Sequence, residues 1–321
     1  MEKKALRIVY MGTPDFAVEG LRRLVEGGYH IVGVVTMPDK PVGRHGSILQ
    51  ASPVKRYALA RGLKVLQPEK LKSETFIAVL RALEADLQIV VAFRMLPEIV
   101  WKMPRLGTFN LHASLLPQYR GAAPINWAII NGEKETGLTT FFLKHEIDTG
   151  EIIRQVRVPI ADTDNAGIVH DRLMVLGGEL VVETVDAILA DTAVPIPQMQ
   201  PGVAELKPAP KLFKETCRID WSGGVKHVYD FIRGLSPHPA AWTECCAGDK
   251  RQELKIFEVE KRFGPVDAGV GTVETDNKTY LKVALKDGYL HILSLQLSGK
   301  RRMEIGDFLR GFRPEGPLRM E

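Results

Sequence analysis

Short apolar runs alternate with amphipathic stretches through the first half of the chain. The apolar runs are rich in β-branched residues, and the stretches between them carry apolar residues at helical spacing. This pattern predicts strands at 6–12, 30–38, 64–68 and 87–93, and helices at 14–28 and 73–85. Strands that alternate with helices form a parallel sheet with helices on both faces. We therefore expect an α/β fold for this half of the chain.

The stretch at 107–127, GTFNLHASLLPQYRGAAPINW, begins like another buried strand but carries polar side chains where that strand ends. Two later segments, LTTFFL at 138–143 and EIIRQVRVPI at 151–160, predict a hairpin added to the sheet. Residues 165–189 have the length and spacing of a long helix, which we expect to close the domain.

The character of the sequence changes after residue 189. Residues 190–210 hold five prolines and show almost no periodicity, which is typical of a linker. Beyond them we expect a helix at 222–235 and several short strands, including a hairpin at 280–297 around Asp287 and Gly288. Short strands in a small unit favour a β-barrel, of the oligonucleotide-binding (OB-like) type. The predicted organisation is a domain at 1–189, a linker at 190–210 and a second domain at 211–321.

Length and composition agree with this division. A chain of 321 residues is long for a single core, so two domains are the default expectation. The formal net charge of +4 permits an anionic partner without demanding one. Cys217, Cys245 and Cys246 are odd in number and lack metal-ligand spacing, which fits a reducing compartment. The apolar run near the N-terminus is too short to cross a bilayer and lacks a signal peptide's cleavage region, so we expect a cytoplasmic protein that does not bind membranes.

The candidates for chemistry gather where the predicted strands end, which is where open parallel sheets bind ligands. Asn110 and His112 are two residues apart, so a strand turns both side chains to one face. Asp148 lies in the loop after the next strand. An amide can donate to a developing oxyanion, an imidazole can supply charge or a proton, and a carboxylate can hold the imidazole or accept a proton. These three residue types together suit acyl transfer.

Other interpretations of these residues have less support. An isolated histidine in a buried strand is more often bonded to the backbone than functional. Three features argue otherwise here: the face shared with Asn110, the position at the end of the most polar strand, and the turn that follows. A metal site is disfavoured because no second His or Cys has suitable spacing. A dinucleotide or a nucleoside triphosphate is not indicated, because Gly12 stands alone in its strand-to-helix turn.

These residues also resemble a known signature. The segment FNLHASLLPQYRGAAPINWAI, together with IDTG, resembles the folate-dependent formyltransferase superfamily, whose pattern is Asn-x-His-x-Ser-Leu-Leu-Pro and then Asp-Thr-Gly. Three further segments, IVYMGTPDFAVEGL, MPDKPVGRHGSILQASPVKRYA and LQLSGKRRMEIGDFLRGF, resemble the methionyl-tRNA formyltransferase family within it. The resemblance covers nearly the whole chain in order. Two segments depart from the family. Residues 45–48, His-Gly-Ser-Ile, replace lysines that often follow the Gly-Arg-Gly of the loop, which is one residue longer here, and AFRMLP lacks the glycine and one residue of the corresponding family segment.

The resemblance implies a Rossmann-like formyltransferase domain followed by an OB-like tRNA-binding domain. The implied reaction moves a formyl group from 10-formyltetrahydrofolate to the amine of methionyl initiator tRNA, with no metal. Asn110, His112 and Asp148 would be catalytic. The residues expected to line the folate site are Ser114, Leu115, Leu116 and Pro117.

Contacts with tRNA are implied in two places. Arg44 matches a functional arginine of the loop at 38–53, which would approach the acceptor end. Lys300, Arg301 and Arg302 are candidates for phosphate contacts from the second domain. Without the resemblance, both segments would be interpreted as ordinary surface loops. We expect a monomer whose partners are the tRNA and the folate.

Two other functions share part of this pattern. A formyltransferase for a nucleotide-linked amino sugar would have the same catalytic core, and the identity of the acceptor separates it from an enzyme that acts on tRNA. A non-catalytic folate-binding or RNA-binding protein would not require the set Asn110, His112 and Asp148. Turnover on any amine would exclude it.

Overall fold

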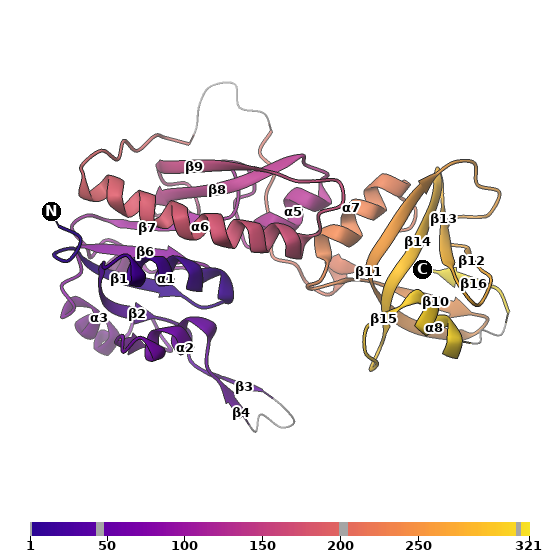
Figure 1. The fold of residues 1–321 in the computed structure, drawn as a ribbon, viewed down its shortest axis with the longest axis horizontal. Coiled ribbons are helices and arrows are strands. Elements are labelled where there is room, and N and C mark those ends of the chain that lie inside the picture. Colours follow the sequence, from indigo (N-terminus) through magenta and orange to yellow (C-terminus); the bar gives the residue numbers. More distant parts are fainter. Residues whose placement is uncertain (1, 43–47, 199–204, 313–315) are drawn as a thin grey trace. The chain divides into compact units, whose positions relative to one another are not determined.

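The computed structural model describes residues 2–42, 48–198, 205–312 and 316–321. Contacts between residues divide the chain into two compact units, which Figure 1 shows in colours that follow the sequence. The first unit comprises Met1–Arg120, Thr136–Val158 and His170–Lys207, and the second comprises Gly121–Glu135, Pro159–Val169 and Pro208–Glu321. The domain boundaries drawn from the sequence, at 1–189, 190–210 and 211–321, stay a prediction.

A seven-stranded sheet forms the centre of the first unit, with the order β5-β2-β1-β6-β7-β8-β9. The first five of these strands run parallel, and β8 pairs antiparallel with β7. The strands are β1 (Arg7–Gly12), β2 (His30–Val35), β5 (Val65–Leu66), β6 (Leu87–Val91), β7 (Thr108–His112), β8 (Glu135–Phe142) and β9 (Ile152–Pro159). The predicted α/β class is confirmed, and the hairpin expected at 138–160 is the β8–β9 edge of the sheet.

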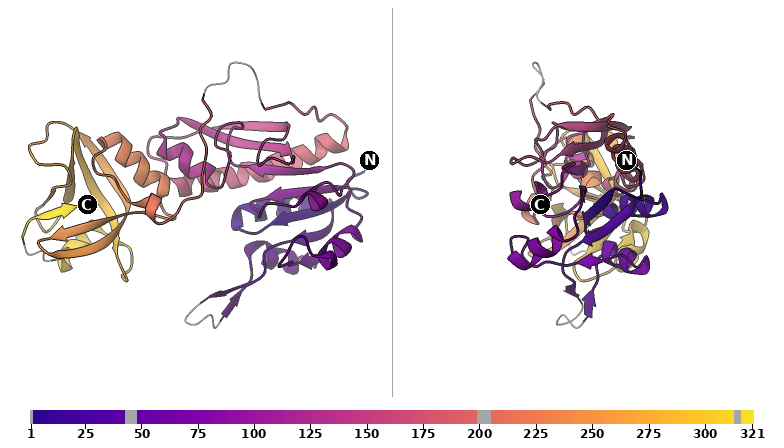
Figure 2. Two further views of the ribbon diagram at one scale, coloured as in Figure 1. Left: turned by 180° about the vertical axis from the view of Figure 1, so that it is seen from behind. Right: turned by 90° about the vertical axis from the view of Figure 1, so that its left-hand side faces the viewer.

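Helices cover both faces of this sheet (Figures 1 and 2). They are α1 (Val18–Glu26), α2 (Pro53–Ala60), α3 (Glu74–Arg81), α4 (Glu98–Trp101) and α6 (Ala166–Leu189), with a 3-10 turn at Asp15–Ala17 before α1. Alternate side chains of β1 point to opposite faces of the sheet, as in any β-strand. Val9 and Met11 join the cluster that includes α3, whereas the hydroxyl of Tyr10 donates to Ala17 O beside α1 at 2.7 Å.

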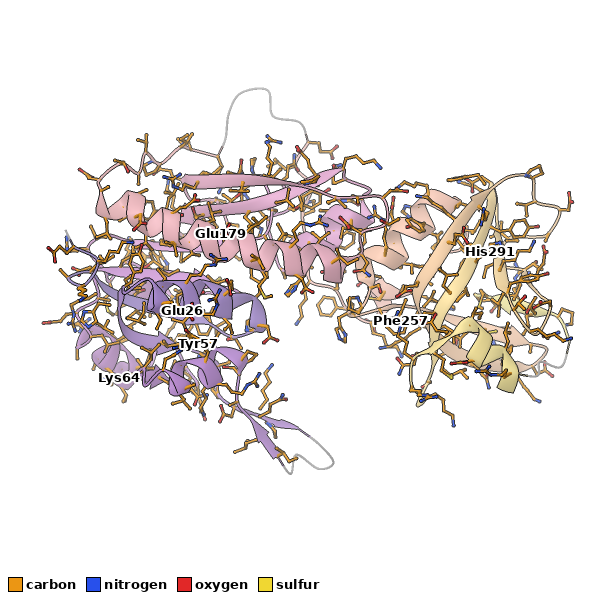
Figure 3. All side chains as sticks on the ribbon, in the orientation of Figure 1. Glu26, Tyr57, Lys64, Glu179, Phe257 and His291 are labelled. Atoms are coloured by element: carbon orange, nitrogen blue, oxygen red, sulfur yellow. The ribbon has the colours of Figure 1, made fainter. Side chains whose placement is uncertain are left out.

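Helix α6 also contacts α1. Arg23 of α1 lies 3.0 Å from Glu179 of α6, a residue labelled in Figure 3. Gly20 of α1 leaves room for the Tyr10 hydroxyl and for Val181 of α6, because a Cβ there would lie 2.8 Å and 3.5 Å from them. The long helix predicted at 165–189 therefore packs where the pattern places it, closing one face of the sheet.

The region expected to be a loop at 38–53 has more structure than its composition indicates. A two-stranded ribbon, β3 (Lys40–Val42) and β4 (Ile48–Gln50), extends from the unit, and helix α2 follows directly (Figure 1). Ser52 caps α2 by accepting from Lys55 N at 3.0 Å. Strands of three residues are too short to show a period, which is why the pattern missed them. The short helix α5 (Pro124–Ile130) was missed for the same reason.

The second unit is an antiparallel sheet with the order β12-β13-β14-β11-β10-β16, and β15 pairs with β14. Its strands are β10 (Ala241–Ala247), β11 (Lys250–Phe263), β12 (Val273–Thr275), β13 (Leu281–Leu285), β14 (Gly288–Leu297), β15 (Met303–Glu304) and β16 (Leu318–Met320). The ends of the sheet meet where Thr272 bridges to Arg319. The predicted small C-terminal β-barrel is confirmed, including the hairpin at Asp287 and Gly288.

Besides α5, this unit contains the helices α7 (Val225–Leu235) and α8 (Ile305–Gly311) and a 3-10 turn at Glu215–Cys217. Helix α7 buries Val228 and Ile232 against strand residues such as Ile256. Asp287 accepts from Val225 N at 2.8 Å, so the hairpin turn caps the start of α7. No helix in the described part of the chain has both the length and the apolar character that a bilayer crossing requires.

Candidate functional site

Strand β7 carries two of the predicted catalytic residues at its carboxyl end. Asn110 pairs with Val90 of β6 on one side and with Phe141 of β8 on the other. His112, two residues later, pairs with Thr139 of β8. Asn110 is half-buried and His112 is 7% exposed. The strand therefore presents the amide and the imidazole from one edge of the sheet, as their spacing predicts.

The imidazole of His112 has a backbone oxygen on one side and a carboxylate on the other. Nε2 lies 2.9 Å from Tyr119 O, and Nδ1 lies 3.9 Å from Asp148 Oδ2. A backbone carbonyl only accepts, so Nε2 carries a hydrogen and donates it to Tyr119. Nδ1 is therefore the nitrogen that gains or loses a proton, and it faces Asp148. The structure brings His112 and Asp148 together.

The loop between β8 and β9 presents Asp148. The residue has φ of 54°, in the left-handed region that Asp tolerates better than most residues. Thr149 Oγ1 donates to Glu146 O at 3.0 Å inside the loop. Gly150 packs so tightly that a Cβ there would lie 1.5 Å from Phe142 O. Gln198, in the segment after α6, donates to the carbonyl oxygens of Asp148 and Gly150 at 2.9 and 2.7 Å.

The predicted folate turn, Ser114 to Pro117, is held by hydrogen bonds to side chains of strands β8 and β9. Ser114 is fully buried, and its hydroxyl donates to Gln118 O at 2.6 Å, so the hydroxyl shapes the turn. Thr139 Oγ1 donates to Ser114 O at 2.7 Å and accepts from Leu116 N at 3.2 Å. Gln155 donates to Leu116 O at 3.0 Å and to Thr139 Oγ1 at 2.9 Å. Leu116 is 3% exposed, and Leu115 and Pro117 are half-buried.

The segment after this turn is hydrogen-bonded to residues that follow α6 in the sequence. Tyr119 has φ of 60°, and its amide donates to Lys207 O at 2.7 Å. Gln118 donates to Glu205 O at 3.2 Å and accepts from Lys207 N at 2.8 Å. Both ends of the Tyr119 peptide are thus engaged, its amide with Lys207 and its carbonyl with His112. The position of the imidazole depends on this docked segment.

The AFRMLP segment follows β6 along the same edge. Ala92 has φ of 46°, and Met95 is 76% exposed. Arg94 donates to Glu69 O at 2.8 Å and also to Pro68 O, and burial lowers the pKa of its guanidinium. Arg94 is therefore used within this unit to hold the segment against the loop after β5.

The structure describes only some of the residues that are predicted to contact tRNA. Arg44 lies outside the described residues. Lys300 and Arg301 are exposed in the turn after β14. Arg302 donates to Ser294 Oγ at 2.7 Å, pairs with Glu258 and lies over the ring of Phe257, which is labelled in Figure 3. Among the described residues, Arg302 is the one of these three cations whose side chain bonds to other side chains of the barrel.

Metal ligands do not gather at this site. Within the described ranges, no three His, Cys, Asp or Glu residues lie close enough together to hold a metal ion. Each cysteine, Cys217, Cys245 and Cys246, is buried and unpaired with another cysteine. The chemistry that the described side chains offer is hydrogen bonding, charge and proton transfer.

Two family profiles and several relatives match this chain over most of its length. The formyl transferase family profile matches residues 6–185, and the profile of the formyl transferase C-terminal domain matches residues 211–313. A methionyl-tRNA formyltransferase of Phocaeicola vulgatus is 71% identical over 324 residues, covering 100% of both chains. One of Bacteroides thetaiotaomicron is 68% identical over 315 residues, covering 98% of both chains.

The chain belongs to the methionyl-tRNA formyltransferase family.

Solved structures of other formyltransferases share the fold at low sequence identity. WlaRD, a sugar 3N-formyl transferase solved in the presence of dTDP and 5-N-formyl-THF, superposes with a TM-score of 0.65 at 19% identity, covering 92% of this chain and 99% of WlaRD. HypX from Aquifex aeolicus in complex with tetrahydrofolic acid gives a TM-score of 0.65 at 19% identity, covering 97% of this chain. This chain spans about half of HypX, 49%. The family resemblance drawn from the sequence is confirmed.

Several residues of the site could not have been found from a methionyl-tRNA formyltransferase motif. Gln198 and Thr139 act on backbone groups of loops distant in sequence, and Tyr119 contributes a carbonyl oxygen. Gln198 lies in the segment predicted as a linker, where periodicity gives no information. A polar residue in an aperiodic segment, here buried at 4% exposure, is a signal that becomes visible only after folding.

Proposed function

We infer that this protein transfers the formyl group of 10-formyltetrahydrofolate to the amino group of methionyl initiator tRNA, which gives N-formylmethionyl-tRNA for translation initiation. Relatives at 71% and 68% identity over their full length carry the name of this activity. The observation that carries the proposal is the approach of His112 to Asp148 at the carboxyl end of the parallel sheet, beside Asn110. Folate is a co-substrate, and two solved neighbours with this fold were obtained with folates.

The proposed reaction is a direct acyl transfer. The neutral amine of the methionyl ester attacks the formyl carbon, a C–N bond forms, and the carbonyl oxygen becomes an oxyanion. Asn110 donates to that oxyanion, and protonated His112 contributes positive charge. The oxyanion then collapses and expels N10 of the folate, which takes up a proton. Holding both reactants in one site makes the attack effectively intramolecular.

Asp148 has two roles in this proposal. Its carboxylate supports the imidazolium through Nδ1, which faces it at 3.9 Å. It also helps to remove the proton that the amine loses on attack. The bond from Nε2 to Tyr119 O supports this assignment, because it leaves Nδ1 as the nitrogen that exchanges the proton.

The substrates are proposed to bind at separate places. The turn formed by Ser114, Leu115, Leu116 and Pro117 lines the folate site, and its backbone is ordered by Thr139 and Gln155. Arg44 and the ribbon that flanks it approach the acceptor end of the tRNA. Lys300 and Arg301, both exposed, contribute phosphate contacts.

We propose the domain boundaries 1–189 and 211–321, joined by 190–210, for a protein that acts as a monomer in the cytoplasm without binding membranes. The second domain would cradle the tRNA. The family profiles, at 6–185 and 211–313, support this division.

The test supplies the protein with 10-formyltetrahydrofolate and one of two acceptors, methionyl initiator tRNA or a dTDP-linked amino sugar. Formylmethionyl-tRNA should form with an apparent Michaelis constant for tRNA that rises steeply with salt, because phosphate contacts release counterions. Turnover of the amino sugar alone would show instead that the protein is a formyltransferase for a nucleotide-linked amino sugar. Folate binding without turnover of either amine would make the protein a binding protein.

A further inference from the structure

The side chain of Gln198 connects three segments of the first unit. Its Nε2 donates to Asp148 O at 2.9 Å and to Gly150 O at 2.7 Å. Its Oε1 accepts from Arg120 Nε at 3.1 Å and from Arg120 Nη2 at 2.6 Å. An amide has two donor hydrogens and two acceptor lone pairs, so this buried group is fully engaged.

The orientation of this amide is determined by its partners. Arg120 can only donate, and the carbonyl oxygens of Asp148 and Gly150 can only accept. The oxygen of Gln198 must therefore face Arg120, and its nitrogen must face the loop. Rotating the amide by half a turn would break all four bonds.

We propose that Gln198 is a positioning residue that sets the distance between Asp148 and His112. This inference rests on the proposed function, in which these two residues act together. The two donated bonds end on the carbonyl oxygens of the residues before and after Thr149, and they hold the loop where Asp148 adopts φ of 54°. Gly150, pressed against Phe142 O, fixes the other side of the same loop.

The position of His112, the other member of the pair, depends on Tyr119 and Arg120. Tyr119 accepts from His112 Nε2 through its carbonyl, and Arg120 is the next residue along the chain. Tyr119 and Arg120 therefore position the imidazole directly and the carboxylate through Gln198. The 3.9 Å separation of His112 Nδ1 and Asp148 Oδ2 is set from both sides by two adjacent residues and one glutamine.

The deciding variant is Gln198→Glu. It keeps the size of the side chain and the acceptor oxygen for Arg120, but it replaces the donating nitrogen with a carboxylate oxygen that faces two carbonyl oxygens. Val194→Ala is the matched control, because Val194 lies in the same segment and is 74% exposed. If Gln198→Glu does not fold, Gln198→Met takes its place, with similar length and no charge.

Single-turnover rates are measured with saturating 10-formyltetrahydrofolate and methionyl initiator tRNA. We expect Gln198→Glu to lower the rate about 10- to 100-fold, since misplacing a catalytic group by about 1 Å has an effect of this size. Its dissociation constant for 5-formyltetrahydrofolate should stay within about twofold of wild type, because the predicted folate turn is held by Thr139 and Gln155 instead. Val194→Ala should match wild type in both measurements.

A double-mutant cycle separates positioning from a general structural role. In the Asp148→Asn background, where the carboxylate is already lost, Gln198→Glu should lower the rate by less than about twofold, whereas independent effects would multiply. Three results would overturn the inference: an unchanged rate with a lower melting temperature, weaker folate binding at an unchanged rate, or effects that multiply. Failure of the proposed function is a different result, in which the wild-type protein itself forms no formylmethionyl-tRNA.

Discussion

His112 Nε2 lies 2.9 Å from the carbonyl oxygen of Tyr119, seven residues further along the chain. This contact assigns the ring hydrogens by chemistry, because the carbonyl can only accept. The nitrogen left for proton exchange is Nδ1, which faces Asp148. A residue at the end of a strand thus obtains both its orientation and its tautomer from the loop that follows it.

Replacing His112 by alanine should reduce formyl transfer by a factor of about 10² to 10⁴, the range typical of a lost acid–base or charge-stabilising group. The transfer rate is measured with saturating substrates, and circular dichroism monitors the fold. His30→Ala is the control, since His30 is exposed at the start of β2. Equal activity of the two variants would remove His112 from the reaction.

Replacing Thr139 by valine should weaken the predicted folate turn. The hydroxyl donates to Ser114 O and accepts from Leu116 N, so its loss leaves buried backbone groups without partners and lowers the free energy of unfolding by about 1–3 kcal/mol. The dissociation constant for 5-formyltetrahydrofolate should rise as the turn loosens. Urea denaturation and calorimetric titration measure the two effects.

Thr136 provides the matched control on the same strand. Its hydroxyl is buried and has no hydrogen-bond partner among the described residues. Thr136→Val replaces that hydroxyl with a methyl group of similar size, so we expect it to be neutral or stabilising by up to about 1 kcal/mol. Equal losses in Thr139→Val and Thr136→Val would show that the bonds of Thr139 contribute nothing to the turn.

Replacing Gly150 by alanine should displace the loop that carries Asp148. The added Cβ would lie 1.5 Å from Phe142 O, a backbone atom that cannot rotate away. We expect a loss of about 1–3 kcal/mol in stability, as for other overpacked sites, together with slower formyl transfer at an unchanged affinity for folate. Gly306→Ala is the control, because a Cβ at Gly306 meets nothing within 4 Å. Normal turnover by Gly150→Ala would mean that the loop tolerates this displacement.

The second unit should lose stability at alkaline pH through Cys245. Burial, with a smaller effect of Cys246, raises the pKa of the Cys245 thiol to about 11. An unfolded thiol ionises near pH 8.5, so between about 8.5 and 11 the unfolded state releases a proton that the folded state keeps. The stabilising contribution of the neutral thiol is complete below about pH 8.5 and is lost as the pH rises through 11. One such proton changes the free energy of unfolding by about 1.4 kcal/mol per pH unit.

Urea titrations of wild type and Cys245→Ala at pH 7.5, 9 and 10 measure this contribution. The alanine variant starts from a lower stability at pH 7.5 because it leaves a cavity, but its stability should fall less steeply with pH. Parallel pH profiles for the two proteins would contradict the assignment to Cys245.

Periodicity predicted the elements that are long enough to show a period. Strands β1, β2 and β6, helix α6 and the hairpins β8–β9 and β13–β14 lie where the pattern of apolar residues places them. The ribbon β3–β4 and helix α5 are shorter than the window over which a period can be recognised. They could be placed only from the folded chain.

The residues of the site differ in whether the sequence alone reveals them. Asn110 and His112 were accessible from sequence, because two positions in one strand share a face. Tyr119 was not, because it acts through a carbonyl oxygen that every residue type possesses. Gln198 was not, because its partners are backbone atoms 48 and 50 residues away, and side-chain chemistry does not specify such pairs.

The outermost strand of the large sheet, β9, has a consequence for how copies of the chain meet one another. An edge strand with free amides can template strand pairing between molecules, which begins aggregation. Here β9 exposes Arg154 and Arg157 and ends at Pro159, which has no N–H, while Ile152 is bridged to Ile196 of the same chain. The opposite edge, β5, is two residues long. The charge and proline of β9 and the shortness of β5 thus disfavour strand pairing between copies of the chain at both borders of this sheet.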